Sequence, residues 1–170
     1  MINKILILGA DGFIGNILYK ELLPYFDVYG TYCCSNPKFD TNKIMFEFDV
    51  ETGNINSILN ELKPNYIILN LKGDYKKQLK VHQELLNYTL SSVDCKIIYI
   101  SSVKVFDGKG KFPSYENDTL LADSVYGKNK VNQEKAISKL PSSKYVVVRL
   151  PLIIGVNSPI IIQLKEASKN

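Results

Sequence analysis

The sequence has few of the residues that build metal centres or disulfide frameworks. It has three cysteines, two of them adjacent at Cys33 and Cys34, and a single histidine, His82. Because there is no C-x-x-C pair and no cluster of cysteine with histidine, we expect neither a zinc site nor a disulfide scaffold. Cys95 directly precedes an apolar run and is typical of a packing residue. This cysteine usage favours a cytosolic protein.

Long apolar runs and a strong charge of one sign are also absent. No run reaches the ~20 residues that a membrane-spanning helix needs. The net charge of +4 is mild and spread along the 170 residues, and the short basic segments are typical of a solvated surface. We therefore expect no membrane and no nucleic-acid partner. The length and the 45% hydrophobic content predict a single globular domain over residues 1–170, large enough to bury a layered core around a sheet.

The pattern around which the chain is organised lies in its first fifteen residues. An apolar run at 5–8 is followed by Gly-Ala-Asp-Gly-Phe-Ile-Gly at 9–15, and then by apolar residues three to four apart. This predicts a strand, a glycine turn and a helix, in a parallel sheet covered on both faces. Gly9 suits a tight turn, Gly12 lets the backbone approach a diphosphate, and Gly15 lets the helix pack closely. The G-x-x-G-x-x-G spacing differs from the G-x-G-x-x-G of many dinucleotide-binding dehydrogenases, so a purely structural turn is the alternative.

The rest of the chain alternates strands with helices. We expect strands at 5–8, 28–31, 45–48, 66–69, 97–100 and 146–148, and helices at about 14–23, 55–62, 75–91, 126–140 and 158–167. On the longest helix the expected inner side carries Leu79, Val81, His82, Leu85, Leu86 and Leu90. This alternation predicts an α/β fold with a doubly wound parallel sheet, in which ligands bind beyond the carboxyl ends of the strands. The glycine turn, Asp49, Asn70, Ser101-Ser102 and Arg149 fall at such ends.

A second pattern combines Ser102, Tyr126 and Lys130. Tyr126 and Lys130 are four residues apart in a helical pattern, so they project from the same face. An ammonium beside a phenol stabilises the phenolate and lowers the tyrosine pKa, which suits proton exchange with a carbonyl or an alcohol near neutral pH. The Ser102 hydroxyl, at a neighbouring strand end, could orient the same oxygen. A chance Y-x-x-x-K on an exposed helix is the alternative.

Taken together, these segments resemble the extended short-chain dehydrogenases/reductases. Within that group the chain is most similar to the dTDP-4-dehydrorhamnose reductase and sugar-nucleotide reductase branch. The similarity runs from residue 2 to about residue 167. The matching segments are 9–15, Phe48-Asp49-Val50, residues 63–70, residues 100–108, residues 115–118, the Tyr-Gly-Lys-Asn-Lys of 126–130, and Val148-Arg149.

The resemblance implies a Rossmann-like NAD(P)-binding domain with the cofactor across the carboxyl edge of the sheet. Its expected diphosphate-binding residues are Gly9, Asp11, Gly12, Phe13, Ile14 and Gly15. Asp49 and Val50 would contact the adenine, and Leu71 and Lys72 would line the nicotinamide half. Tyr126 would be the catalytic acid and base, Lys130 would hold the ribose and tune Tyr126, and Ser102 would bind the substrate oxygen. The implied reaction is hydride transfer between NAD(P)H and a nucleotide-activated sugar.

The sequence also departs from the pattern of that branch. Ser102-Val103-Lys104 replaces a usual Thr-Asp-Tyr, and His82 replaces an asparagine of the long helix; a lone histidine on an apolar face is typical of a hydrogen-bonded core residue. Lys72 stands in a usually alanine-rich turn, where it meets either a phosphate or solvent. Family members continue into a smaller C-terminal domain that closes over the sugar nucleotide, and we expect this chain to lack most of it.

Two points of function stay open on sequence grounds. Residues 31–35, Thr-Tyr-Cys-Cys-Ser, contain neither the acid that favours NAD nor an arginine that favours NADP, and the missing acid tilts the expectation toward NADP. An NAD(P)-dependent sugar-nucleotide reductase is the first hypothesis, with an epimerase or dehydratase of the same group beside it. A non-catalytic NAD(P)-binding regulatory subunit is the alternative. Helices 75–91 and 122–140 could pair in a homodimer.

Overall fold

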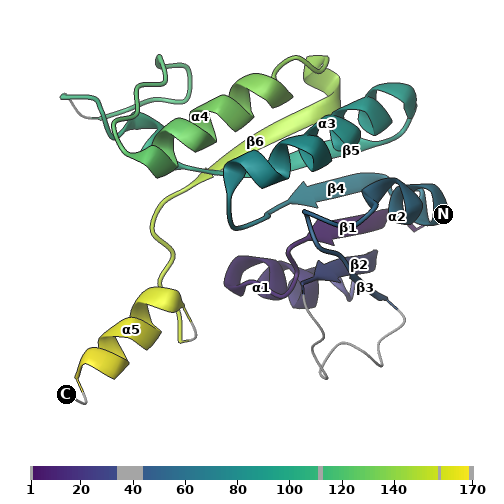
Figure 1. The fold of residues 1–170 in the computed structure, drawn as a ribbon, viewed down its shortest axis with the longest axis horizontal. Coiled ribbons are helices and arrows are strands. Elements are labelled where there is room, and N and C mark those ends of the chain that lie inside the picture. Colours follow the sequence, from purple (N-terminus) through teal and green to yellow (C-terminus); the bar gives the residue numbers. More distant parts are fainter. Residues whose placement is uncertain (1, 34–43, 111–112, 157, 169–170) are drawn as a thin grey trace.

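A six-stranded parallel sheet forms the centre of the computed structural model, which describes residues 2–33, 44–110, 113–156 and 158–168 (Figure 1). The strand order is β3-β2-β1-β4-β5-β6. The strands are β1 Lys4–Leu8, β2 Asp27–Tyr32, β3 Met45–Glu47, β4 Tyr66–Leu69, β5 Lys96–Ser102 and β6 Tyr145–Leu150. This is the order of a doubly wound Rossmann-like sheet, so the predicted fold class is confirmed.

Helices cover both faces of the sheet. They are α1 Phe13–Leu22, α2 Ile55–Leu62, α3 Tyr75–Ser91, α4 Val125–Ile137 and α5 Pro159–Ala167, with short 3-10 turns η1 Val103–Phe106 and η2 Ser142–Lys144. α2, α3 and α4 bury one face of the strands, including Leu6, Ile67 and Ile97. α1 covers the opposite face, where Ile5, Ile7 and Ile68 alternate with the first set. The continuous apolar runs of β1 and β4 are thus explained by burial on two sides.

The helix α5 stands away from the sheet. Figure 1 shows it beyond the end of β6, joined to the sheet by an extended segment. None of its residues is buried, although Ile162 and Leu164 are apolar. On the α1 face, Val148 and Leu150 of β6 are only partly buried and Val146 is exposed. Among the described residues, none of the helices combines the length and the apolar character needed to cross a bilayer.

Most element boundaries fall within two residues of the prediction, and the differences have local causes. α4 ends at Ile137, three residues earlier than expected. After it, the backbone N–H groups of Lys139 and Leu140 donate to carbonyls three residues back instead of four, and Pro141 follows. The sequence did not predict η1, which turns the chain directly after β5. The expected inner side of α3 is partly wrong, because Leu79 and Leu90 are 48% and 56% exposed. The expected loop at 32–43 lies mostly outside the described residues.

Candidate functional site

The site begins where the chain reverses its direction across the sheet, between β1 and β4. β1 pairs with β2 on one side and with β4 on the other, so the loops after β1 and β4 leave in opposite directions and open a crevice. Gly9 follows β1 with a φ of 81°, a left-handed conformation that favours glycine. A Cβ at Gly9 would lie 2.7 Å from the carbonyl oxygen of Asn70, the residue after β4. The two loops therefore meet at the floor of the crevice.

The first turn of α1 faces this crevice. Its N-cap is Gly12, which has no side chain to occupy the helix N–H groups. By contrast, the N-caps of α2, α3 and α4 are Asn54, Asp74 and Ser124, and each of these side chains accepts a backbone N–H of the first turn of its own helix. Uncovered N–H groups and the positive end of the helix dipole suit a phosphate. A Cβ at Gly12 would have only ordinary contacts, 3.6 Å from Cε and 3.7 Å from Nζ of Lys72.

Two neighbouring cavities occupy the crevice, and they share Asn70, Leu71 and Lys72. The larger, of about 350 Å³, is lined on its other sides by Ile14, Tyr75, Gln78, Ser102, Tyr126, Asn129, Lys130 and Gln133. The smaller, of about 210 Å³, is lined by Gly9, Asp11, Gly12, Thr31, Tyr32, Cys33, Phe48 and Val50. The buried side-chain nitrogen of Asn70 has no hydrogen-bond partner among the described residues. A buried amide of this kind is costly unless a ligand or water completes it.

The structure gathers most of the predicted site residues around these cavities. The glycine turn and Val50 line the smaller one, and the Ser102, Tyr126 and Lys130 set lines the larger. Phe13 lies in a third cavity, of about 620 Å³, between α1 and residues 153–156. Asp49 is not among the lining residues of these cavities; its carboxylate accepts the backbone N–H of Glu51 at 2.7 Å instead. Gly15 lies beneath the turn, where a Cβ would overlap the carbonyl oxygen of Gly9.

Tyr126 is placed by the start of α4. The Ser124 hydroxyl accepts the N–H of Gly127 at 3.0 Å and donates to the Asp107 carboxylate at 2.5 Å. The hydrogen bond from the Ser124 hydroxyl, with those from the backbone N–H groups of Asp123 and Ser124, lowers the pKa of Asp107, so the cap is held by a carboxylate. A Cβ at Gly127 would overlap the carbonyl oxygen of Lys104 in η1. Gly127 therefore lets the first turn of α4 pack against η1, a role that the sequence pattern alone did not reveal.

The expected lowering of the Tyr126 pKa by Lys130 is wrong for this structure. Partial burial raises the Tyr126 pKa, and a side-chain hydrogen bond with Ser102 works against that rise. The Lys130 Nζ lies 5.8 Å from the centroid of the Tyr126 ring and donates to the carbonyl oxygen of Ile100 at 2.9 Å. It also lies 4.9 Å from the ring centroid of Tyr99. The ammonium thus hydrogen-bonds to the backbone of β5 and lies near both aromatic rings.

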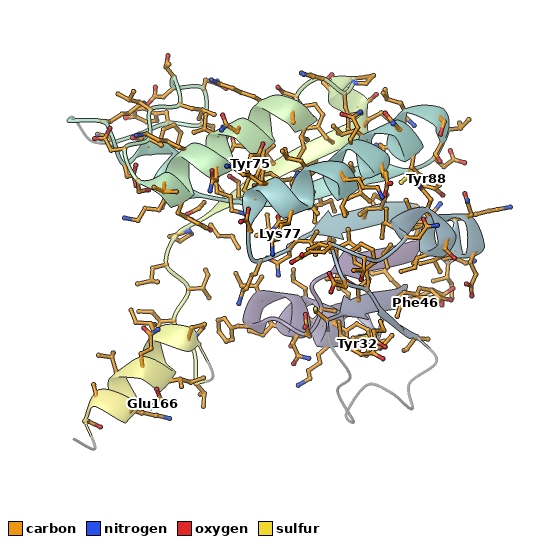
Figure 2. All side chains as sticks on the ribbon, in the orientation of Figure 1. Tyr32, Phe46, Tyr75, Lys77, Tyr88 and Glu166 are labelled. Atoms are coloured by element: carbon orange, nitrogen blue, oxygen red, sulfur yellow. The ribbon has the colours of Figure 1, made fainter. Side chains whose placement is uncertain are left out.

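Lys130 belongs to a buried polar layer between α3, α4 and β5. Burial lowers the pKa of Lys130 to about 8, although the Glu134 carboxylate raises it in part. In the same layer, the Tyr99 hydroxyl donates to the side-chain oxygen of Gln133, and the Gln133 amide donates to Gln78 at 3.3 Å. Tyr75 lines the larger cavity with these groups and lies between α3 and α4 (Figure 2). These glutamines were not predicted as site residues, and their only sequence signal is a polar side chain on an otherwise apolar helix face.

Arg149 supports the site without lining either of the two cavities. Its guanidinium donates to both carboxylate oxygens of Glu134, at 2.8 Å from Nη2 and 3.1 Å from Nε. Glu134 is 4% exposed, so this ion pair is buried on the α4 face of the sheet. Arg149 also donates to the carbonyl oxygen of Glu116 at 2.8 Å and lies 5.1 Å from the ring centroid of Phe106. Arg149 therefore joins β6, α4 and the loop before α4.

His82 is buried, as its apolar surroundings predicted, but it is not hydrogen-bonded in the expected way. The side chain is 5% exposed, and its Nε2 has no partner among the described residues. Burial, together with the positive charge of Lys130, lowers the pKa of His82 to about 4. The ring packs edge-on against Tyr75, with 6.5 Å between the centroids. His82 is therefore neutral at physiological pH.

The low pKa of His82 makes the stability of the fold sensitive to acid. The folded pKa lies below the ordinary 6.5, so the unfolded chain binds the proton more readily, and stability falls as the pH drops from 6.5 to about 4. Between about pH 7 and about pH 4, we expect wild type to lose about 3 kcal/mol more unfolding free energy than a His82→Gln variant. Urea unfolding of both proteins at each pH measures this difference. Parallel pH curves for the two proteins would contradict it.

Comparison with known proteins identifies a family that this chain matches. A model of the family described as the RmlD substrate binding domain matches residues 74–161, more than half of the chain. A solved dTDP-4-dehydrorhamnose reductase from Clostridium acetobutylicum superposes with a TM-score of 0.64 at 26% identity, covering 98% of this chain and 59% of that one. A dTDP-glucose 4,6-dehydratase from Bacillus anthracis, solved in complex with NAD, superposes with a TM-score of 0.77 at 17% identity, covering 98% of this chain and 62% of that one. At that identity, the second likeness concerns the fold alone.

The curated relatives carry a different name. The methionine adenosyltransferase 2 subunit beta of Xenopus laevis is 28% identical over 90% of this chain. The match covers 48% of that protein, so the chain spans about half the length of the curated relatives it matches.

Proposed function

The chain belongs to the family of the RmlD substrate binding domain, and we propose that it binds a nicotinamide dinucleotide and reduces a keto group of a nucleotide-activated sugar. The observation that carries the proposal is the pair of adjoining cavities at the turn between β1 and α1. One holds the glycine turn and the other holds Ser102, Tyr126 and Lys130. A dinucleotide has two halves joined by a diphosphate, and this arrangement offers a place for each half.

The residues present fit such a cofactor. Gly12 leaves the first turn of α1 open to the diphosphate, beside residues 13–15, and the Lys72 ammonium near Gly12 adds a positive charge there. Asn70 lines both cavities, and its side-chain nitrogen, which has no partner among the described residues, leaves a hydrogen-bond donor over at this place. Val50 and Phe48 offer apolar contact to an adenine, with Asp49 between them. Leu71 lines both cavities and offers apolar contact to either half.

In this proposal Tyr126 donates a proton from its hydroxyl to the carbonyl oxygen of the sugar. Its raised pKa keeps the phenol protonated near neutral pH, which suits the direction of reduction. Ser102 hydrogen-bonds the same oxygen, and Lys130 binds ribose hydroxyls from the wall of the larger cavity. A bound reduced nicotinamide supplies the hydride that the carbonyl carbon accepts. Epimerisation or dehydration by the same residues is the neighbouring possibility within this class.

A non-catalytic, cofactor-binding regulatory subunit is the second candidate. It is favoured by the hydrogen bond of Lys130, whose Nζ donates to the carbonyl oxygen of Ile100 in β5. It is also in keeping with relatives named as a subunit beta. The two candidates share dinucleotide binding and differ in turnover.

Dinucleotide binding is tested with a Gly12→Val variant. A Cβ at this position has only ordinary contacts, so the variant is expected to fold, while the added methyl groups fill the space above the first turn of α1. We expect saturable binding of NADH or NADPH to wild type, followed by nicotinamide fluorescence, and its loss in Gly12→Val. Gly110→Val is the matched control, because a Cβ at Gly110 has no neighbour within 4 Å among the described residues. A wild-type chain that binds neither dinucleotide overturns the proposal.

A further inference from the structure

The smaller cavity contains a carboxylate at an unexpected place. Asp11, in the glycine turn, reaches across to the end of β2, where its Oδ2 accepts the backbone N–H of Cys33 at 3.2 Å. Tyr32, the last residue of β2, marks this end of the strand in Figure 2. The sequence separation is 22 residues, so only the fold brings the carboxylate to this position.

The position of Asp11 is fixed by the packing of the turn against β2. The backbone N–H of Gly9 donates to the Thr31 hydroxyl at 3.0 Å, and that of Ala10 donates to the Thr31 carbonyl at 2.9 Å. Thr31 is fully buried, so both hydrogen bonds are shielded from water. Asp11 itself is exposed and lines the cavity together with Tyr32 and Cys33. A ligand in the cavity therefore meets this carboxylate at the end of β2.

In a sheet of this strand order, the end of the second strand holds the ribose of the adenosine half of a dinucleotide. The acid that usually binds the ribose hydroxyls there follows the second strand in the sequence. Residues 31–35 of this chain contain no acid. We propose that Asp11 supplies this carboxylate from the glycine turn, so that the site selects NAD(H) over NADP(H). This inference rests on the proposed function and concerns the adenosine half of the same site.

The physical basis is a difference in charge at one ribose oxygen. The 2′- and 3′-hydroxyls of the NAD(H) ribose can each donate a hydrogen bond, and a carboxylate can accept them. The 2′-phosphate of NADP(H) carries between one and two negative charges near neutral pH, and it would face the Asp11 carboxylate in a confined cavity. Lys72 lines the same cavity, but its ammonium lies beside Gly12, on the side of the diphosphate. The geometry thus reverses the preference for NADP that residues 31–35 suggested.

The test compares NADH and NADPH on wild type and on Asp11→Asn. Asparagine keeps an oxygen that accepts the Cys33 N–H, so the turn is expected to stay in place while the charge is removed. We expect wild type to bind NADH about tenfold more tightly than NADPH, and Asp11→Asn to bring the two affinities to within about threefold of each other. Asp27→Asn is the matched control, because Asp27 is an exposed acid at the other end of the same strand.

Each outcome of this comparison decides the point. A wild-type preference for NADPH, or any ratio of the two affinities that Asp11→Asn leaves unchanged, overturns the role of Asp11 while dinucleotide binding stands. Binding of neither dinucleotide overturns the proposed function and the role of Asp11 with it. Competition of AMP and of adenosine 2′,5′-bisphosphate against bound NADH gives a second measurement on wild type alone. Stronger competition by the bisphosphate contradicts the inference, and stronger competition by AMP supports it.

Discussion

Replacing Tyr126 by phenylalanine is expected to reduce turnover of a keto sugar nucleotide by about a thousandfold, the usual contribution of a positioned acid or base. The variant removes only the hydroxyl oxygen, and Tyr126 is 55% exposed at the cavity wall, so the fold is expected to stay intact. The loss is therefore expected in the catalytic constant, with the affinity for NADH or NADPH within about twofold of wild type.

The measurement is the oxidation of NADH or NADPH in the presence of a panel of dTDP- and UDP-linked keto sugars, followed by absorbance. Tyr25→Phe is the matched control, because Tyr25 is an exposed tyrosine that follows α1, away from the cavities. Turnover that survives in Tyr126→Phe would refute the assigned proton donor. Dinucleotide binding without turnover on any member of the panel would favour the regulatory subunit.

The second large effect is expected at Gly15, where alanine should destabilise the fold by about 3 kcal/mol. A Cβ there would overlap the carbonyl oxygen of Gly9 and lie 2.9 Å from the Cα of Ala10. Both neighbours are backbone atoms of a turn that is itself held by Thr31, so neither can move aside cheaply. The helix α1 would have to shift away from β1 as a unit.

Urea denaturation of wild type and Gly15→Ala measures this cost, read from the midpoint at an unchanged slope. Gly110→Ala serves as the control, because it adds the same methyl group where no atom of the described part of the chain lies within 4 Å. Equal midpoints for Gly15→Ala and wild type would mean that α1 does not pack against the turn as closely as described.

The elements could be predicted from the sequence because their signals are local. A strand buried on both faces needs an apolar residue at every position, which β1 and β4 show directly. α3 was predicted with its observed bounds, Tyr75–Ser91, from its long run of apolar residues at helical spacing. The resemblance to the dTDP-4-dehydrorhamnose reductase branch is confirmed by the family match and by the solved reductase.

Several functional assignments still stand as predictions. The catalytic roles of Ser102, Tyr126 and Lys130 await the measurements above, as does the choice between enzyme and regulatory subunit. Pairing of the helices at 75–91 and 122–140 in a homodimer stays a prediction.

The sequence by itself determined the fold class, the family and the residues that meet at the carboxyl edge of the sheet, because apolar runs and glycine spacing act over a few residues. Only the tertiary structure decided how charges are directed at that edge. Asp11 meets Cys33, and Lys130 meets the carbonyl of Ile100, across separations of 22 and 30 residues. Such contacts depend on which strands lie side by side and how closely the turns pack. No local pattern records that geometry, which is why the expected effect of Lys130 on Tyr126 was wrong and the position of Asp11 was missed.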